Sequence, residues 1–344
     1  MVVKAVQLIA HGVPGKFELR EMPDPVPAPD EVVVRVRACG LNHLDLWTEE
    51  GGLPVPIALP RTLGCEAAGE ITALGEDVDQ LKVGDRVAVQ SNLFCGVCEF
   101  CARGDEALCL KSRLVGVDCD GGFAEKLLAP ARAIVALPPE VNFETSAALT
   151  LAGSTAMHML TDRVEVKPGD WVLVIGASSG VGSAAIQIAK QLEAHVIATG
   201  STQAKRDLAH RLGAKYVIDS THPNWSAEVR KITHKRGVDV VIEHVGGEVL
   251  LQAFQSLARG GAVVTCGATA GREVPVQLWP FFVRQHRLIG SYGRNHADMT
   301  ATLEWAAQGR LHPVVFKSYP LAKAPEAFAA LRTRTVMGKL LITV

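Results

Sequence analysis

The middle of the chain alternates between short apolar runs and amphipathic stretches. From Trp171 onward, runs rich in valine and isoleucine are each followed by a stretch with helical periodicity. Continuous apolar runs are typical of strands buried on both faces, and alternation with helices indicates a covered parallel sheet. Six strands are predicted, with four clear helices between them: WVLVI, HVIAT, YVID, DVVIE, AVVTCG and RLIGSYG. The pattern therefore predicts a doubly wound α/β domain of the nucleotide-binding kind.

The two ends of the chain follow different patterns. The first 130 or so residues contain short β-branched runs such as EVVVRVRA, bounded by glycine, proline and aspartate, and are predicted to be β-rich. The last 50 or so contain two amphipathic helices and a terminal strand, KLLITV, which we expect to pair with the β-rich part. The predicted division is a catalytic domain at 1–152, a dinucleotide-binding domain at 153–293 and a return to the catalytic domain at 294–344.

Length and charge narrow the function classes. The 344 residues suggest about two domains. The formal net charge is −1 and no block of like charges occurs, which argues against nucleic-acid binding and against a polybasic membrane patch. No apolar run approaches the ~20 residues of a membrane helix, and the N-terminus lacks the pattern of a signal peptide. We therefore expect a cytoplasmic protein that acts on a small molecule.

A glycine-rich turn follows the first strand of the predicted parallel sheet. GASSGVG stands directly after WVLVI and opens a helix, which is the context that pyrophosphate binding requires. Glycines allow a tight turn and close approach of the backbone, and the helix N-terminus supplies oriented N–H groups. The alternative is a glycine-rich turn in some other α/β protein. The residues expected to contact the cofactor are Gly176, Ser178, Ser179, Gly180, Val181 and Gly182.

The end of the second strand bears on the choice between NADP and NAD. An acidic residue there would bind the ribose hydroxyls and repel a 2′-phosphate, but HVIATGSTQAKRDL has none at that place. Small hydroxyl residues and cations suit a phosphate dianion, so we predict NADPH, with NADH as the alternative. The alternative is that Lys205 and Arg206 are only the solvated face of the next helix. The further expected cofactor contacts are Gly200, Ser201, Thr202, Lys205, Arg206 and Arg334.

Four of the eight cysteines crowd into 15 residues. Cys95, Cys98, Cys101 and Cys109 follow a C-x2-C-x2-C-x7-C spacing. Tetrahedral zinc takes four thiolates, and four protein ligands leave no position open for a substrate. We therefore predict one structural zinc per chain. Unliganded thiols, local disulfides and an iron–sulfur cluster are the alternatives.

These motifs together resemble those of the medium-chain dehydrogenase/reductase superfamily. The stretch from Gly64 to Val89, GCEAAGEITALGEDVDQLKVGDRVAV, looks like the sheet-and-turn core of that family, and GASSGVG resembles the quinone-reductase form of its glycine turn. The resemblance spans essentially the whole chain. It implies a β-rich GroES-like catalytic domain with a zinc lobe at 92–112, joined to a six-stranded dinucleotide-binding domain.

The sequence departs from the zinc alcohol dehydrogenases of this superfamily at their catalytic metal. The resemblance implies a zinc with three protein ligands: a Cys, a His beside a Glu, and a further Cys. The three corresponding positions are Asn42, Cys65 before Glu66, and Leu151, and Leu44 stands where a Ser or Thr would relay the proton. We therefore expect no catalytic zinc. A rebuilt metal site that uses Cys39, Cys65, His43 or Glu66 is the alternative.

The candidate catalytic residues follow from the same resemblance. Asn42 lies at the former metal position, and Thr155 matches the position beside the nicotinamide. His43 either lines the active cleft or is a hydrogen-bonded histidine at a helix start. Asp45 either orients neighbouring groups, which we favour, or caps the helix that follows.

The expected reaction follows from the missing metal. An unactivated alcohol is hard to oxidise without a Lewis acid, whereas hydride addition to an enone or quinone places its charge on an enolate oxygen. Asn42 and backbone N–H groups near Gly153 to Thr155 are candidate donors to that oxygen. We predict an NADPH-dependent reductase of α,β-unsaturated carbonyls or quinones. The alternatives are a zinc-dependent alcohol dehydrogenase with a rebuilt metal site and a non-catalytic NADPH-binding protein.

The resemblance also implies assembly into a homodimer or homotetramer. Members of the superfamily commonly join the last strands of their cofactor sheets edge to edge. The corresponding segment here runs from about Val274 to Ile289. An exposed strand edge of that kind invites pairing with a second copy.

Overall fold

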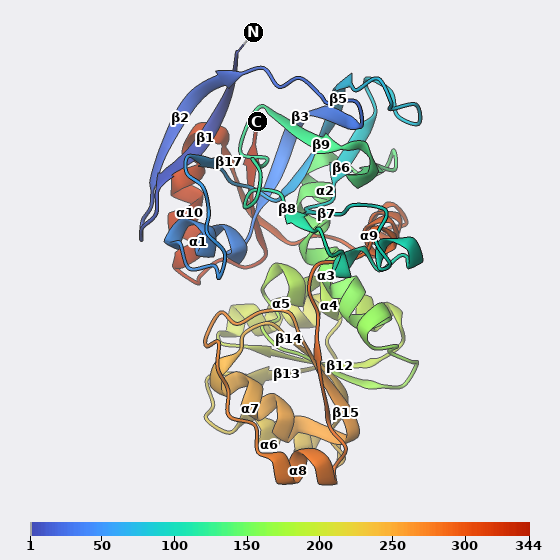
Figure 1. The fold of residues 1–344 in the computed structure, drawn as a ribbon. Coiled ribbons are helices and arrows are strands. Elements are labelled where there is room, and N and C mark those ends of the chain that lie inside the picture. Colours follow the sequence, from blue (N-terminus) through green and yellow to red (C-terminus); the bar gives the residue numbers. More distant parts are fainter. Residues whose placement is uncertain (1) are drawn as a thin grey trace. The chain divides into compact units, whose positions relative to one another are not determined.

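The computed structural model describes residues 2–344 and divides the chain into two units. The first consists of Met1–Ser154 together with Gly293–Val344, and the second is Thr155–Tyr292 (Figure 1). Helix α3 (Ala152–His158) runs across the boundary in the sequence, and a π-helical turn follows at Met159–Arg163. Each unit is described by itself.

The first unit is built around a seven-stranded sheet in the order β10-β6-β5-β3-β18-β17, with β9 paired to β3. A three-stranded sheet, β2-β1-β4, and a two-stranded antiparallel sheet, β7-β8, accompany it. The strands are β1 (Val2–Ala10), β2 (Lys16–Pro23), β3 (Glu31–Leu41), β4 (Arg61–Thr62), β5 (Glu66–Leu74), β6 (Arg86–Val89), β7 (Asn92–Leu93), β8 (Arg113–Leu114), β9 (Lys126–Pro130), β10 (Ile134–Ala136), β17 (Val315–Pro320) and β18 (Lys339–Thr343).

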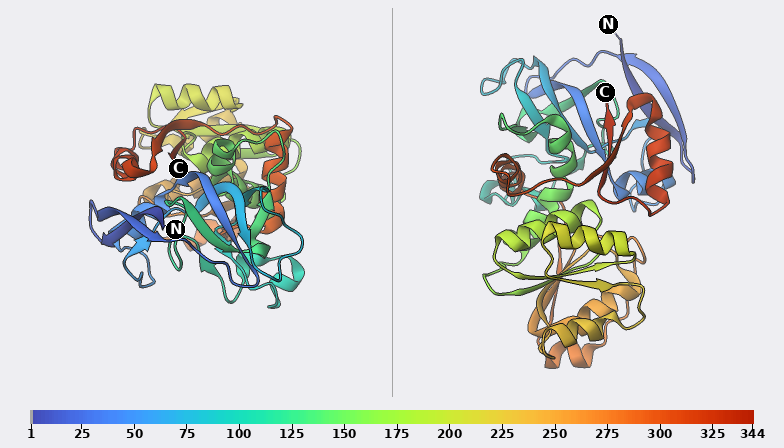
Figure 2. Two further views of the ribbon diagram at one scale, coloured as in Figure 1. Left: turned by 90° about the horizontal axis from the view of Figure 1, so that it is seen from above. Right: turned by 180° about the vertical axis from the view of Figure 1, so that it is seen from behind.

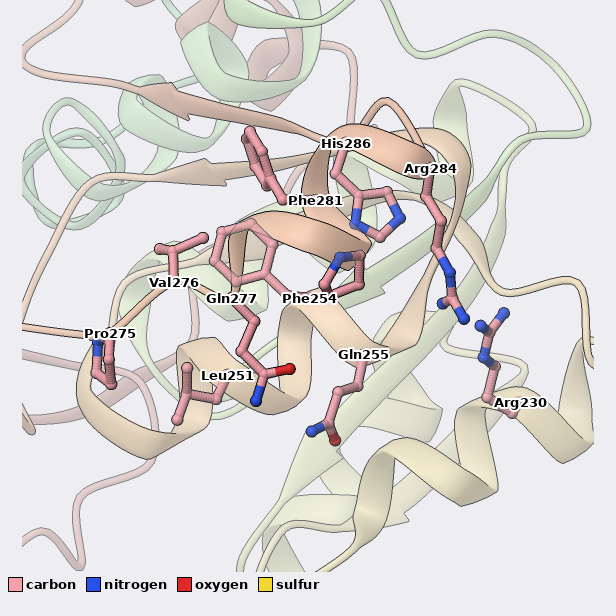
Figure 3. A pocket seen from close by; sticks show the side chains of 11 residues that line it. Arg230, Leu251, Phe254, Gln255, Pro275, Val276, Gln277, Phe281, Arg284 and His286 are labelled. Carbon is pink, nitrogen blue, oxygen red and sulfur yellow. The ribbon is translucent and has the colours of Figure 1, made fainter.

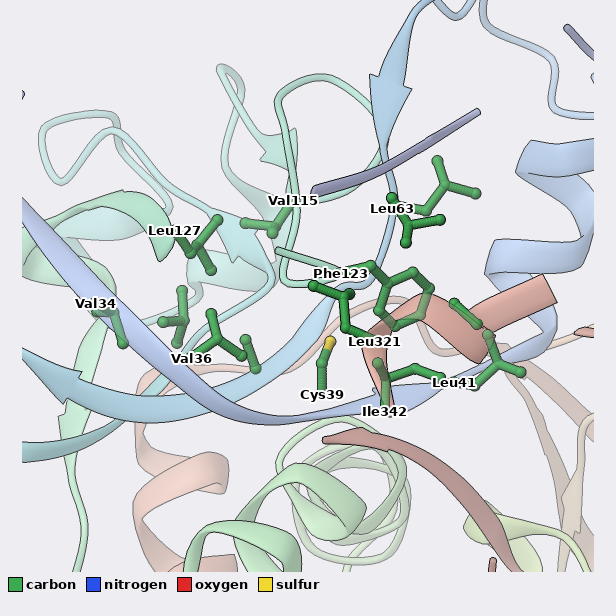
Figure 4. Packing of buried hydrophobic residues seen from close by; sticks show 14 of the residues in the cluster. Val34, Val36, Cys39, Leu41, Leu63, Val115, Phe123, Leu127, Leu321 and Ile342 are labelled. Carbon is green, nitrogen blue, oxygen red and sulfur yellow. The ribbon is translucent and has the colours of Figure 1, made fainter. Parts of the chain in front are cut away.

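The core of the first unit gathers side chains from both ends of the chain. Val34 and Val36 on β3 pack with Leu321 and Ile342 from the last 25 residues (Figure 4). On β3, Val34 and Val36 are buried while Arg35 and Arg37 are exposed, which is the period-2 alternation of a half-buried strand. The ring of Phe123 lies 5.9 Å from that of Phe328, in an edge-to-face arrangement. The C-terminal segment is therefore part of this core.

The pairing of the last strand determines what lies at the end of β3. β18 runs antiparallel to β3, with Leu341 opposite Gly40, and β5 flanks β3 on its other side, with Glu66 opposite Gly40. The end of β3 is thus enclosed by the starts of β5 and β18. The helices of this unit are α1 (His43–Glu50), α2 (Phe143–Leu149), α9 (His296–Ala307) and α10 (Ala324–Arg332).

The second unit is a doubly wound parallel sheet, as the alternating pattern predicts. All neighbours are parallel, in the order β13-β12-β11-β14-β15-β16, and helices cover both faces (Figure 2). The elements are β11 (Trp171–Val174), α4 (Gly180–Gln191), β12 (His195–Gly200), α5 (Gln203–Leu212), β13 (Tyr216–Asp219), α6 (Trp225–Ile232), β14 (Val238–Glu243), α7 (Gly247–Ser256), β15 (Leu257–Thr265), α8 (Leu278–Val283) and β16 (Arg287–Gly290). The short helix α8, between β15 and β16, was not among the predicted elements.

Throughout residues 2–344, none of the helices combines the length and the apolar character that crossing a membrane would require.

Candidate functional site

A buried polar network lies at the end of β3, and we name it after its three members, Asn42, Glu66 and Lys339. The Lys339 ammonium lies 2.7 Å from Glu66 Oε2 and donates to Asn42 Oδ1 at 2.6 Å. The Asn42 amide in turn donates to Glu66 Oε2 at 3.1 Å. Glu66 and Lys339 are only 1% and 5% exposed. The ammonium, the amide and the carboxylate therefore form a closed ring of hydrogen bonds.

The remaining hydrogen-bonding groups of the network are also engaged. Glu66 Oε1 accepts from the backbone N–H groups of Leu151 at 2.6 Å and Ala152 at 3.2 Å. Lys339 donates to the carbonyl of Leu41, and Asn42 Nδ2 to the carbonyl of Gly40. A Cβ at Gly40 would lie 2.5 Å from Glu66 Oε2 and 2.2 Å from the carbonyl oxygen of Ala147, so only glycine lets these groups close together. Such full pairing is what a buried charge requires.

Asp45 ties the start of α1 to the segment before β5. It is the third residue of the helix, and its Oδ2 accepts from the backbone N–H of Asn42, the N-cap residue, at 2.8 Å. Oδ1 accepts from the N–H of Gly64 at 3.1 Å. Burial raises the pKa of Asp45 to about 7, and the charge of Glu66 adds to that rise. Asp45 therefore both caps the helix and fixes Gly64 beside Cys65.

The three positions that the superfamily resemblance aligns with catalytic metal ligands lie around this network. Asn42 contributes an amide that binds Lys339 and Glu66, and Leu151 contributes its backbone N–H. Cys65 is buried, and burial raises the pKa of its thiol well above the ordinary value. The ligand atoms of Cys39, Cys65, Asp45 and Glu66 do not gather into a metal-sized group within residues 2–344. The charged partner of the Glu66 carboxylate in this structure is the Lys339 ammonium.

The four clustered cysteines do converge. Their sulfur atoms all lie within 4.8 Å of one another, with Cys98 Sγ 3.5 Å from Cys101 Sγ and Cys95 Sγ 3.9 Å from Cys101 Sγ. Four sulfurs at about 2.3 Å from a tetrahedral zinc would be about 3.8 Å apart. Backbone N–H groups, first that of Cys101, lower the pKa of Cys98 to about 6 and so favour its thiolate. The residues therefore fit a structural zinc.

The glycine turn of the second unit has the predicted geometry of a strand–turn–helix. Gly176 takes φ +66° directly after β11, and the Ser179 side chain caps α4 by accepting from the N–H of Gly182 at 2.8 Å. A Cβ at Gly182 would lie 2.3 Å from the Gly176 carbonyl oxygen, so close packing of turn on helix requires glycine there. Ser178, Gly180 and Val181 complete the turn. The N–H groups at the start of α4 can receive a pyrophosphate.

His244 also contacts this turn, and the sequence reasoning did not select it. Its Nε2 lies 3.0 Å from Ser179 Oγ, and it follows directly after β14. Enclosure by the surrounding protein lowers the pKa of His244 to about 4, so the ring is neutral at physiological pH. The signal available in the sequence was the position of His244 directly after β14, because the carboxyl ends of β14 and β11 lie at the same end of a parallel sheet.

Arg206 and Lys205, the two cations predicted near the end of β12, have different partners. Arg206 is held by the Gly200 carbonyl at 3.0 Å and forms a 2.8 Å ion pair with Asp219. Lys205 Nζ lies 3.5 Å from Ser201 Oγ, and Ser201 is exposed. Thr202 is the N-cap of α5 and accepts from the N–H of Lys205. Lys205 and Ser201 are therefore the better placed of these groups to meet a phosphate.

The remaining candidates lie in other surroundings. His43 is the first residue of α1 and is exposed, whereas Thr155 in α3 is buried. Arg334 is an exposed residue after α10 with φ +57°. Lys339 was not singled out from the sequence. Its signal was a lysine in a terminal apolar strand, GKLLITV, because lysine is almost never buried unless paired.

Comparison with known proteins agrees with this architecture. Residues 28–139 match the family described as the alcohol dehydrogenase GroES-like domain, and residues 180–308 match the family described as zinc-binding dehydrogenase. An alcohol dehydrogenase of Geobacillus stearothermophilus is 32% identical over 332 residues, which cover 95% of this chain and 96% of that protein.

Two solved structures bear on the chemistry. A crystal structure of an NAD-dependent alcohol dehydrogenase superposes with a TM-score of 0.95 at 37% identity and covers 99% of each chain. A 2-octenoyl-CoA carboxylase reductase in complex with NADP and 2-octenoyl-CoA superposes with a TM-score of 0.91 at 28% identity, covering 99% of this chain and 87% of that one.

The fold and the glycine turn thus define a nicotinamide-dependent oxidoreductase. The chain belongs to the medium-chain dehydrogenase/reductase superfamily, among its zinc-type alcohol dehydrogenase-like members, which confirms the resemblance inferred from the motifs.

Proposed function

We propose that the protein is an NADPH-dependent reductase of α,β-unsaturated carbonyls or quinones that works without a catalytic metal. One observation carries this proposal. The Glu66 carboxylate and the Asn42 amide, which lie where the resemblance implies a metal site, both bind the Lys339 ammonium. The bound cofactor would supply the hydride. A conjugated acceptor needs only hydrogen-bond donors for its enolate oxygen, whereas an alkoxide needs stronger stabilisation. The similarity to an NADP-bound reductase whose described ligand is an enoyl thioester supports this substrate class.

The residues of the first unit would act in different ways. Both amide N–H groups of Asn42 already donate, to Glu66 Oε2 and to the Gly40 carbonyl, so we assign Asn42 a positioning role. His43 is the adjacent exposed donor, and we propose that its ring N–H meets the enolate oxygen. Asp45 accepts from the backbone N–H of Asn42 and so fixes the start of the helix that carries His43. Thr155 is retained as the residue expected beside the nicotinamide.

We propose NADPH as the preferred cofactor because of Lys205 and Ser201. Replacement of Lys205 by alanine should raise the KM for NADPH about tenfold and leave the KM for NADH within about twofold, since a charge-assisted contact to the 2′-phosphate is lost. Lys190, a cation near the end of α4, provides the matched control as Lys190→Ala. Equal changes in both KM values for Lys205→Ala would contradict the assignment.

We also propose that two copies pair through β16. This strand is an edge of the six-stranded sheet, and Leu288 on it is 44% exposed. An unprotected edge strand with an exposed apolar side chain favours pairing with another copy.

The function is tested by a substrate panel on the purified protein. NADPH oxidation would be followed with 2-cyclohexenone and benzoquinone, and NADP⁺ reduction with primary and secondary alcohols, before and after dialysis against a chelator. We expect enone or quinone turnover that dialysis leaves unchanged. Turnover of alcohols alone, restored after dialysis only by added zinc, would overturn the proposal.

That second result would support the candidate function favoured by the names of the relatives, a zinc-dependent alcohol dehydrogenase. It would require a rebuilt metal site from Cys65, Cys39 or Glu66, and therefore the opening of the ion pair between Glu66 and Lys339. Tight NADPH binding with no turnover on the whole panel would instead support a non-catalytic NADPH-binding protein.

A further inference from the structure

The second unit contains a pocket of about 450 Å³ that is remote from its glycine turn. Its lining comes from the end of α6, the end of α7, and the segment around α8 that leads into β16. These segments precede β14, β15 and β16, so the pocket lies at the amino ends of the strands. The glycine turn follows β11 and lies at the carboxyl ends, where doubly wound sheets bind their nucleotide. The pocket is therefore separate from the expected cofactor site.

One end of the pocket is positively charged without a carboxylate to balance it. Arg230 and Arg284 extend toward one another there (Figure 3), and neither forms an ion pair with an Asp or Glu in residues 2–344. Arg230 is held in place by the backbone carbonyls of Lys235 at 3.0 Å and Arg236 at 2.9 Å. Burial, and then the charge of Arg284, lower the pKa of Arg230. An anion between the two guanidinium groups would offset this repulsion.

A buried histidine stands beside the two arginines. His286 is 8% exposed, it lines the pocket, and its Nε2 has no hydrogen-bond partner in the part of the chain that the structure describes. Burial, followed by the charges of Arg284 and Arg230, lowers the pKa of His286. A buried polar atom without a partner is uncommon, and a bound water, ion or ligand group is one way to satisfy it. An anionic ligand would reduce the positive charge around His286 and favour the protonated ring, whose Nε2–H would then donate to the anion.

The rest of the pocket is apolar. Leu251, Val276 and Phe281 lie toward the end away from the arginines (Figure 3), and the rings of Phe254 and Phe281 meet edge to face at 5.9 Å. A mainly apolar cavity with a few convergent polar groups is typical of small-molecule sites, and this volume falls in their usual range. The lining would bury a hydrocarbon chain or ring while the arginines bind its acidic end.

We propose that this pocket binds a small amphipathic carboxylate, with its carboxyl group between Arg230 and Arg284 and its apolar body against Phe254 and Phe281. The pocket would be a regulatory or accessory site, since it lies at the amino ends of the strands and the glycine turn lies at their carboxyl ends. The inference is independent of the proposed reaction. Seven of the eleven lining residues lie in the segment 274–289, which includes the strand through which we propose that two copies pair, so the pocket is tested in the assembled protein.

The test is calorimetric titration of the full-length protein, in the assembly state in which it is purified, with octanoate. We expect saturable binding of octanoate, and a dissociation constant about tenfold or more higher for acetate, which lacks the apolar body. Arg284→Gln should weaken octanoate binding about tenfold or more, because a charge-assisted contact is lost. Arg230→Gln provides a second variant. Arg287→Gln removes an exposed arginine that does not line the pocket and should leave binding unchanged.

Two outcomes would overturn the inference. Equal affinity for octanoate and 1-octanol would show an apolar cavity without anion recognition. Octanoate affinity that is unchanged in both Arg284→Gln and Arg230→Gln would place any binding elsewhere. NADPH-dependent turnover of Arg284→Gln in the absence of octanoate should match that of the unmodified protein, which separates this inference from the proposed reaction.

Discussion

The first unit contains two polar clusters at the places where the superfamily resemblance implies metal ions, and they differ in what they offer an ion. In the zinc lobe, four cysteine sulfurs lie within 4.8 Å of one another, and three of the four cysteines are partly exposed. In the network of Asn42, Glu66 and Lys339, the carboxylate is buried and already meets an ammonium, an amide and two backbone N–H groups.

The difference concerns charge as well as the number of possible metal ligands. A buried carboxylate needs positive charge or hydrogen-bond donors, which a metal or a lysine can supply. At the former catalytic position, Lys339 supplies the charge, and Asn42 supplies the donor between them. At the zinc lobe, the four converging thiols fit a structural zinc, which would supply the positive charge. The two clusters should therefore respond in opposite ways to metal removal and to charge removal.

The largest effect is expected on removing the charge of the network. Lys339→Met should lower the free energy of unfolding by about 3–5 kcal/mol, because it leaves a buried carboxylate without its ion-pair partner. Chemical denaturation of the two proteins measures the difference. The zinc content should not change.

A surface pair provides the matched control for this variant. Lys323 pairs with Glu326 where both side chains are more than half exposed, so Lys323→Met should leave the free energy of unfolding almost unchanged. The double variant Lys339→Met with Glu66→Gln should regain part of the loss, since no buried charge then remains. A loss of less than about 1 kcal/mol for Lys339→Met would contradict the importance of the ion pair.

The next effect concerns pH and Asp45. Its pKa is raised to about 7 in the folded chain by burial, against about 3.9 in an unfolded one. The proton is thus bound more tightly in the folded state, so the contribution of Asp45 to stability is complete below about pH 4 and is lost as the pH rises to about 7. At about 1.4 kcal/mol per pH unit, the loss would reach up to about 4 kcal/mol.

The control for this prediction is the variant Asp45→Asn, whose amide at position 45 cannot titrate. Unfolding free energies from pH 4.5 to 7.5 should fall more steeply for the unmodified protein than for the variant. The slopes are compared, since the amide also changes the hydrogen bonds to Asn42 and Gly64 at every pH. Parallel curves would show that Asp45 does not titrate in this range.

The smallest effect is expected on the reaction itself. Asn42→Ala should lower enone turnover about tenfold or more, equivalent to about 1.4 kcal/mol, because Lys339 and Glu66 lose the amide that joins them next to His43. His43→Ala should lower kcat to a similar extent with less effect on thermal stability. Unchanged turnover in Asn42→Ala would remove this residue from the mechanism.

Much of the fold could be predicted because its signals are local. The strand–helix alternation after Trp171 identified the first four strands of the second unit, each a short apolar run before an amphipathic helix, and the runs AVVTCG and RLIGSYG identified the last two. Helix α8 was missed because LWPFFV is short, contains a proline and is mostly exposed, so it has no amphipathic period to detect. Helix α1 was anticipated only as a helix start near His43.

The candidate site could be predicted only in part because its contacts are distant in the sequence. The cysteine spacing located all four converging thiols, which lie within 15 residues. Lys339, however, reaches Asn42 across almost the whole chain through the pairing of β18 with β3, and no local pattern contains that pairing. His244 meets Ser179 in the same way, through the neighbouring positions of β14 and β11 in the sheet.

Zinc content per chain tests the contrast between the two clusters most directly. It would be measured by elemental analysis of protein purified without added metal, beside the variant Cys101→Ser. We expect about one zinc per chain in the unmodified protein and almost none in the variant, because the four cysteines would hold the only ion. About two zinc ions per chain, with about one retained in Cys101→Ser, would contradict this expectation and place a metal at Cys65 and its neighbours.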